Sequence, residues 1–221
     1  MQNEQRSAII VFLLCAVCAL GPALVAVLTE EKLLMHAQIN SRHYPVTDHF
    51  FRYFTHLGDG LVPTAIALFL LAFRTWRQFL IVAFSATFSS IIAQVLKRFF
   101  FADSDRPSMF FDRMPGIQTV TGLDFYQHFS FPSGHTTAAF STGLAVAILI
   151  GGQRAGFACA VLASAIGFSR IYLSQHFTID VIGGATIGTF TALLVWWWLF
   201  QSPFSGKQWL DRRPLRKASA N

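Results

Sequence analysis

The sequence predicts an all-α, polytopic membrane protein, a bundle of six transmembrane helices. Of its 221 residues, 53% are hydrophobic and only 13% are charged, and its mean hydropathy is +0.48. An average soluble domain carries about 25% charged residues, so these figures exclude both a soluble globule and a disordered chain. The 15 glycines, 8 prolines and 3 cysteines follow no period, which excludes collagen-like and disulfide-rich proteins.

Six apolar segments are candidates to cross a bilayer, where a helix needs about 20 apolar residues, or fewer when its ends reach the interface. They are residues 8–28, 61–73, 79–96, 136–150, 155–168 and 181–200. The last contains Gly183, Gly184, Ala185 and Gly188, a small-residue face suited to close helix packing. A cleavable signal peptide is the alternative for the first segment, but the apolar run after Arg6 is longer than such peptides have.

The basic residues predict that both ends of the chain lie in the cytoplasm. The two sides of the membrane are nearly balanced in basic residues, so two further features set the orientation. Basic residues cluster between Lys207 and Lys217 after the last span, and Trp196, Trp197, Trp198 and Trp209 form an aromatic belt beside them. The inner basic residues are then Arg6, Arg74, Arg77, Arg154, Lys207, Arg212, Arg213, Arg216 and Lys217. We expect a multi-pass protein of the cell (inner) membrane.

Two segments between spans face the outside in this arrangement. Residues 29–56 mix charged and apolar residues and end in Phe50, Phe51, Tyr53 and Phe54, a pattern that predicts a helix lying in the interface. Residues 97–135 form a longer polar loop of the kind that carries function. The short sequence Gly58-Asp59-Gly60 opens the second span and is interpreted as a turn or helix cap, with a place in the site as the alternative.

Three groups of polar residues lie at or near membrane depth, where a charged side chain is costly unless it is paired or hydrated. They are Lys97, Arg98 and Arg106-Pro107 after the third span; Pro132-Ser133-Gly134-His135 at the start of the fourth; and Ser169-Arg170, His176 and Asp180 between the fifth and sixth. One loop and one helical hairpin separate the groups, so the chain returns to the same side each time. All three are therefore predicted on the outer face.

The combined chemistry of these groups suits phosphoryl transfer. Lys97, Arg106 and Arg170 are cations without a matching cluster of carboxylates, as a phosphate dianion requires. Ser133 provides a hydroxyl at the start of a helix, where Gly134 allows close approach of a backbone N–H and the helix terminus favours an anion.

The histidines of these groups can supply the nucleophile and the acid. His176 and Asp180 are four residues apart, so in a helix the carboxylate lies one turn from the imidazole. An aspartate in that place fixes the tautomer and leaves the other ring nitrogen free to attack phosphorus. His135 remains to protonate the departing oxygen.

Each group also has a structural alternative when it is taken alone, and only their occurrence together on one face favours a site. The alternatives are interfacial anchors for Lys97 and Arg98, a helix cap for Ser133-Gly134-His135, and a structural hydrogen-bonded pair for His176 and Asp180. The remaining histidines have no metal-ligand spacing and are interpreted as interfacial or loop residues. They are His36, His43, His49, His56 and His128.

The polar groups resemble the three-part signature of the type 2 phosphatidic acid phosphatase and vanadium haloperoxidase superfamily. That signature is a lysine, six residues and Arg-Pro; then Pro-Ser-Gly-His; then Ser-Arg, five residues, His, three residues and Asp. The second and third parts are intact as Pro132-Ser133-Gly134-His135 and Ser169-Arg170, His176, Asp180. The first departs, because eight residues separate Lys97 from Arg106, which implies an insertion or a displaced lysine. The resemblance covers residues 57–200, the core of a single domain (1–221) with a basic cytoplasmic tail (201–221).

The resemblance implies a role for each matching residue. His176 would be the nucleophile that forms a phosphohistidine, with Asp180 orienting it and His135 as the general acid. The phosphate oxygens would be held by Lys97, Arg106, Ser133, Gly134 and Arg170. No metal or other cofactor would be required. The partners implied are a lipid phosphate and the bilayer, with no nucleic acid and no protein partner.

The leading functional hypothesis is therefore a membrane lipid phosphatase acting at the outer leaflet. The substrates left open are undecaprenyl diphosphate, phosphatidylglycerophosphate, phosphatidate and lipid A, with selectivity expected in residues 30–56 and 108–130. A phosphotransferase would pass the same phosphoryl group to an alcohol, and a lipid-phosphate transporter or sensor would not need His176 and Asp180. A serine hydrolase is disfavoured, because Ser133 and His135 on one helix start are poorly placed for attack.

Overall fold

The computed structural model describes residues 2–215, and this part of the chain is helical with no strands. The α-helices are α1 (Gln2–Thr29), α2 (Lys32–Ile39), α3 (Pro45–Phe54), α4 (Leu61–Phe73), α5 (Trp76–Val95), α6 (Gly134–Ile150), α7 (Gly152–Tyr172) and α8 (Thr178–Trp196). Short 3₁₀ helices are η1 (Thr55–Gly58), η3 (Pro107–Arg113), η5 (Pro203–Gly206) and η6 (Gln208–Asp211), and π-helical turns are η2 (Leu96–Phe100) and η4 (Trp197–Gln201). The all-α prediction is confirmed for these residues.

A helix is present at each of the six predicted spans. Four of them are long and apolar enough to cross a membrane alone: α1, α7, α5 extended by η2, and α8 extended by η4. Helix α4 meets the same test only together with residues 45–58, from which it is bent by 48°. Helix α6 is apolar but has 17 residues, about 26 Å, slightly less than a hydrocarbon core of about 30 Å. The described residues thus contain four or five spans by length and composition, and six remains a prediction.

Helix α6 lies at the centre of the bundle, against α1, α5, α7 and α8. Apolar helices gain little from mutual burial in lipid, so their contact depends on close packing through small residues. Glycines on α8 allow it here: a Cβ at Gly188 would collide with the Thr137 carbonyl oxygen, and one at Gly184 would lie 2.5 Å from the Ser133 carbonyl oxygen. The predicted small-residue face of the last span thus packs on α6.

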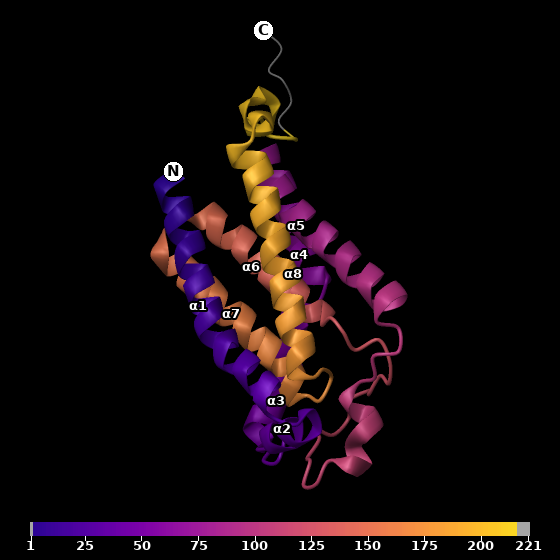
Figure 1. Ribbon diagram of the computed structural model, residues 1–221. Helices are drawn as coiled ribbons and strands as arrows, with labels where there is room; N and C mark the ends of the chain where they lie inside the picture. The colour runs from indigo at the N-terminus through magenta and orange to yellow at the C-terminus, as the bar shows by residue number, and fades with distance from the viewer. Residues whose placement is uncertain (1, 216–221) are drawn as a thin grey trace.

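The ends of the bundle differ in character (Figure 1). The start of α1 and the end of α8 lie at one end, and α2, α3 and the 101–133 segment lie at the other. At the first end, Arg77 forms an ion pair with Asp211 at 2.8 Å and donates to the carbonyl oxygens of Leu199 and Ser205. Arg77, which the sequence marks only as an inner basic residue, therefore packs the segment after α8 against α5. Residues 216–221 of the predicted tail, with Arg216 and Lys217, lie outside the described residues.

The interfacial segment differs from its prediction. A single helix over 29–56 is wrong, because α2 ends with Asn40 as its C-cap and α3 begins again at Pro45. Proline is favoured in the first turn of a helix, where its missing N–H is no loss, so it fixes the new start. Between α5 and α6, the long loop is present as expected, with η3 as its main regular element.

We expect Gly188→Ala to destabilise the protein, because the new methyl group would meet the backbone of α6 rather than a movable side chain. Overpacking of this kind costs about 1–3 kcal/mol. Thermal unfolding in detergent measures the loss. Gly21→Ala on α1 is the control, since a Cβ there meets no atom within 4 Å, and equal unfolding temperatures for both variants would contradict the packing described.

Candidate active site

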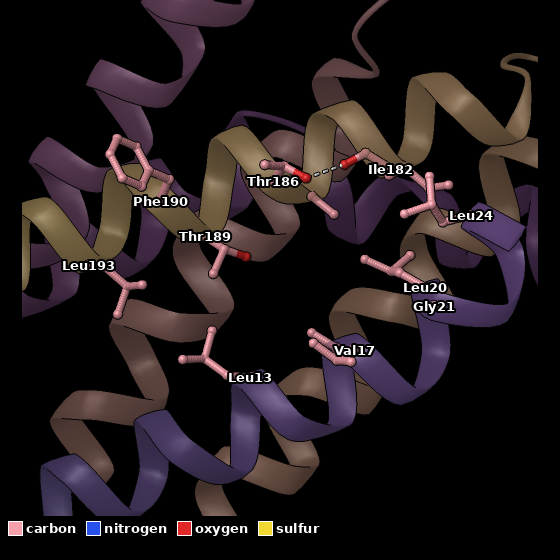
Figure 2. A pocket seen from close by; sticks show the side chains of 12 residues that line it. Leu13, Val17, Leu20, Gly21, Leu24, Ile182, Thr186, Thr189, Phe190 and Leu193 are labelled. Carbon is pink, nitrogen blue, oxygen red and sulfur yellow. Dashed lines mark hydrogen bonds between the residues drawn. The ribbon is translucent and has the colours of Figure 1, made fainter. Parts of the chain in front are cut away.

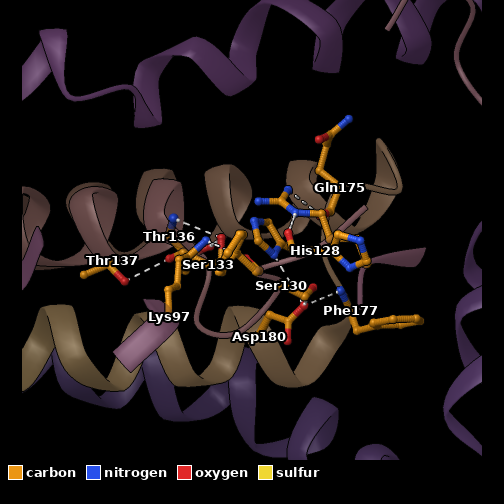
Figure 3. Close-up of polar contacts among 12 residues, drawn as sticks. Lys97, His128, Ser130, Ser133, Thr136, Thr137, Gln175, Phe177 and Asp180 are labelled. Carbon is orange, nitrogen blue, oxygen red and sulfur yellow. Dashed lines mark hydrogen bonds and ion pairs between the residues drawn. The ribbon is translucent and has the colours of Figure 1, made fainter. Parts of the chain in front are cut away.

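The predicted polar groups meet at the end of the bundle that carries α2 and α3. Lys97 comes from the turn after α5, Arg106 precedes η3, Ser133 caps α6, and Arg170 ends α7. His176 lies in the turn between α7 and α8, and Asp180 in the first turn of α8. Figure 3 shows Lys97, Ser133 and Asp180 around the segment that precedes α6.

His176 and Asp180 form a pair that is almost fully buried. The His176 Nδ1 atom lies 3.3 Å from Asp180 Oδ2, although His176 precedes the helix instead of lying in it. The same oxygen accepts from the Ser130 hydroxyl at 2.5 Å and from the Phe177 backbone N–H at 2.9 Å. The carboxylate is thus fixed from three directions, and the His176 Nε2 atom has no hydrogen-bond partner within residues 2–215.

Burial keeps the His176 imidazole neutral. Desolvation lowers its pKa from 6.5 to about 3; the Asp180 carboxylate opposes this, and the positive charges of Arg106 and Lys97 add to it. A neutral imidazole with one nitrogen held by an aspartate has a free lone pair on the other, which is the state that a nucleophile needs.

The cations of the site bind neutral oxygen atoms, and within the described chain none of them pairs with a carboxylate. The Lys97 ammonium donates to the Phe129 carbonyl at 3.0 Å. Arg106 donates to the carbonyls of His128 and Gln175, both at 3.0 Å. Arg170, 7% exposed, donates to the Thr55 hydroxyl at 2.7 Å, while its Nε is buried without a partner. Their positive charge is therefore left for an anion, and Lys97 reaches the site despite the longer spacing to Arg106.

The start of α6 adds backbone donors to these cations. Ser133 is the N-cap, and its hydroxyl oxygen accepts from the Thr136 backbone N–H (3.4 Å) and hydroxyl (2.9 Å). The Ser133 N–H donates to the Asp180 carbonyl at 2.9 Å and so joins α6 to α8. Open space lies beside Gly134, where the first N–H groups of a helix have no partner within the helix. Ser133 is fully buried and engaged as a cap, which speaks against a serine nucleophile.

His135 is held by a carboxylate that the sequence interpretation left aside. Its Nε2 lies 2.6 Å from Asp59 Oδ1. The other Asp59 oxygen lies 2.8 Å from His56 Nδ1. The turn predicted at Gly58-Asp59-Gly60 is present, but the Asp59 side chain does not cap α4 and contacts His135 instead, as the alternative interpretation expected. An acidic residue between glycines at the outer face was the available signal.

Other contacts of the site had no signal in the sequence. Ser130, which fixes Asp180, and Thr55, which holds Arg170, lie outside the predicted motifs. Among the remaining histidines, His36 is fully buried in α2, so its interpretation as an interfacial or loop residue is wrong. Its Nε2 lies 3.2 Å from the Ser174 hydroxyl, next to the turn that carries His176.

Helix α2 covers that turn from outside. The Lys32 ammonium lies 3.8 Å from the centre of the Phe177 ring, and Asn40 donates to the Ile171 carbonyl at 3.2 Å. The Phe110 ring of η3 lies 6.1 Å from the Phe177 ring. The two segments expected to set selectivity, 30–56 and 108–130, thus meet beside His176.

A separate apolar groove of about 400 Å³ lies between α1 and α8 (Figure 2). Its lining includes Leu13, Leu20, Ile182 and Phe190 and no charged residue. Such a groove accommodates hydrocarbon but not a phosphate, so it is distinct from the polar site.

Fold and site together define an integral membrane protein with a cationic, histidine-bearing site at one end of a helical bundle. A sequence profile of the PAP2 superfamily matches residues 78–204, and the chain belongs to that superfamily. It is 31% identical over 183 residues to the lipid A 1-phosphatase of Rhizobium johnstonii, covering 73% of this chain and 72% of that protein.

Two further relatives cover different shares of the chain. The bacitracin transport permease protein BcrC of Bacillus licheniformis is 41% identical over 68 residues, so the match covers about a third of that protein (32%) and 31% of this chain. The crystal structure of Aquifex aeolicus LpxE superposes with a TM-score of 0.62 at 28% identity, over 73% of this chain and 92% of that one.

We expect acid to destabilise the protein in part through His36. Burial lowers the pKa of this histidine from 6.5 to about 4, so below pH 6.5 the unfolded chain takes up a proton that the folded chain does not. Stability therefore falls between pH 6.5 and 4, by up to about 1.4 kcal/mol per pH unit. The fall in unfolding temperature from pH 7 to 4.5 should be smaller in His36→Gln than in the wild type. His49→Gln, at an exposed position, should fall as the wild type does; an unchanged fall in His36→Gln would contradict the assignment.

Proposed function

We propose that this protein is a membrane lipid phosphatase that cleaves a lipid phosphate or diphosphate through a phosphohistidine on His176. The observation that carries the proposal is the neutral His176 imidazole, held by Asp180 among cations that no carboxylate of residues 2–215 neutralises. Membership of the PAP2 superfamily supports it.

The first step transfers the phosphoryl group to the protein. The His176 Nε2 lone pair forms a bond to phosphorus while the bond to the leaving oxygen breaks, and His135 donates its proton to that oxygen. Asp180 stabilises the positive charge that develops on His176. In the second step His135 takes a proton from water, the water oxygen attacks phosphorus, and the P–N bond breaks to release inorganic phosphate.

Throughout both steps the three nonbridging oxygens need positive charge and hydrogen-bond donors. Lys97, Arg106 and Arg170 supply such donors, which are now bound to neutral carbonyl or hydroxyl oxygens. Exchanging one such neutral oxygen for a phosphate oxygen turns a hydrogen bond between a cation and a neutral group into one between opposite charges, which adds Coulombic attraction. Prearranged charge of this kind is usually the largest contribution to catalysis.

The substrate is proposed from the membrane setting of the site. Lipid A and undecaprenyl diphosphate are the first candidates to test, with phosphatidate and phosphatidylglycerophosphate beside them. We place the site at the outer leaflet, since it lies at the end of the bundle opposite the start of α1 and the end of α8 (Figure 1). Release of inorganic phosphate from these four lipids by the detergent-solubilised protein identifies the substrate.

The site geometry favours an enzyme over a transporter or sensor. Binding and release of a lipid phosphate would need the cations, but not a buried His–Asp pair with a neutral imidazole. A phosphotransferase would share the first step, so adding glycerol or sugar alcohols to the assay distinguishes it by the formation of a new phosphoester.

We expect His176→Ala to lower phosphate release by at least about 10³-fold, because it removes the nucleophile. Asp180→Asn should lower it by about 10²-fold or more, because the amide cannot stabilise the charged imidazole. His49→Ala is the matched control and should act as the wild type does, since this histidine is exposed on α3. Full activity in His176→Ala would contradict the proposed function.

The covalent intermediate gives an independent measurement. Wild-type protein quenched in alkali during turnover of a ³²P-labelled lipid phosphate should carry label that acid removes, as a phosphohistidine does, and His176→Ala should carry none. Vanadate, which mimics the transferring phosphoryl group, should inhibit release. Labelling on serine instead would assign the chemistry to another residue.

A further inference from the structure

The segment between α3 and α4 lies directly against the site, although it belongs to none of the motifs. Thr55 accepts from Arg170 at 2.7 Å, and Asp59 lies 2.6 Å from His135. A Cβ on Gly58 would lie only 3.1 Å from the His135 Cβ and 2.8 Å from Ile166. One short turn therefore contacts two residues of the proposed machinery at once.

We infer that Asp59 is a positioning residue for His135, which it orients for proton transfer to and from the substrate. The inference rests on the proposed function, because it assigns a task to the proposed general acid. It concerns a residue that neither the sequence motifs nor the family profile includes, since the profile begins at residue 78.

The geometry of the carboxylate supports this role. Asp59 Oδ1 faces His135 Nε2, and Oδ2 faces His56 Nδ1 at 2.8 Å, so both oxygens are fixed. The His135 ring is then held with its proton on Nε2, and only Nδ1 is left for the substrate. That nitrogen gives a proton to the leaving oxygen in the first step and regains one from water in the second. The Nε2 proton stays with Asp59 throughout.

A purely local role does not explain the contacts of Asp59. It precedes Gly60, the N-cap of α4, and that helix has no side-chain cap. Capping α4 would be the ordinary use of an aspartate at this position. Asp59 contacts two histidines instead. Burial of the ring and the charge of Arg170 both act against protonation of His135, and the negative charge of Asp59 opposes them.

The inference predicts a loss that depends on the leaving group. General acid catalysis contributes about 10²–10⁴-fold when the leaving group is a poor one, as the alkoxide of a lipid monophosphate is. p-Nitrophenolate leaves without a proton. We therefore expect Asp59→Asn to slow the phosphorylation step by at least about 10-fold with the lipid phosphate, and by less than about 3-fold with p-nitrophenyl phosphate.

Rapid-quench measurements follow the phosphorylation step with the lipid phosphate as formation of phosphohistidine. Stopped-flow measurements follow it with p-nitrophenyl phosphate as the burst of p-nitrophenol. Both record this step before the phosphohistidine is hydrolysed. Asp211→Asn is the control, because Asp211 forms an ion pair with Arg77 at 2.8 Å at the other end of the bundle, outside the segments expected to set selectivity. This variant should change the rate of the phosphorylation step by less than about 3-fold with either substrate. Unfolding temperature establishes that the variants are folded.

The outcomes separate the inference from the proposed function. Selective loss with the lipid phosphate in Asp59→Asn supports the positioning role, and recovery in Asp59→Glu strengthens it. Equal loss with both substrates, or no loss with either, overturns it while leaving the phosphatase proposal intact. Absence of a phosphohistidine in the wild type would overturn the proposed function itself.

Discussion

The close contact between the starts of α6 and α8 is the constraint on which the rest of the site depends. Gly184 and Gly188 let the backbones approach until the Ser133 N–H donates to the Asp180 carbonyl. That single hydrogen bond places the N-terminus of α6 beside the aspartate that fixes His176. Side chains larger than hydrogen at either glycine would separate the two helices, and with them the start of α6 and His176. Because lipid offers little hydrophobic gain for helix association, this contact has to come from shape.

The site also brings three positive charges close to that contact. The buried Lys97 and Arg170 and the half-buried Arg106 repel one another, and each loses hydration. The chain supplies neutral carbonyl and hydroxyl partners, from Phe129, His128, Gln175 and Thr55, which offset part of the desolvation without cancelling the charge. A carboxylate partner would have stabilised these cations more, and would have competed with the phosphate of the proposed substrate. The proposed function therefore explains why the cations have neutral partners.

How far the sequence predicts this structure depends on whether the signal is local. The six apolar segments, the start of α6 at Ser133 and the small-residue face of α8 follow from periodicity, capping and composition, and each is present. The break of the interfacial helix has a local signal, because Asn40 caps the end of α2 and Pro45 starts α3. The roles of Ser130 and Thr55 could not be predicted from local sequence. Ser130 contacts Asp180, 50 positions away, and Thr55 contacts Arg170, 115 positions away. Lys97 is the intermediate case: its spacing to Arg106 was unusual, yet the π-helical turn after α5 still brings it to the Phe129 carbonyl.

The two His–Asp pairs of the site differ in their surroundings, and the proposed function gives them different roles. The His176 and Asp180 side chains are 2% and 3% exposed, whereas those of His135 and Asp59 are 30% and 32% exposed. In the dry pair, desolvation favours the neutral imidazole, which is a nucleophile. In the more exposed pair, burial of the ring and the charge of Arg170 lower the pKa of His135, and the Asp59 carboxylate opposes them, so Asp59 is the group that favours a protonated imidazole. Environments that separate two similar titrating groups are the usual way to assign acid and nucleophile within one site. On this basis the proposed roles of His176 and His135 rest on the different surroundings of the two rings, and not on the order of the histidines in the sequence.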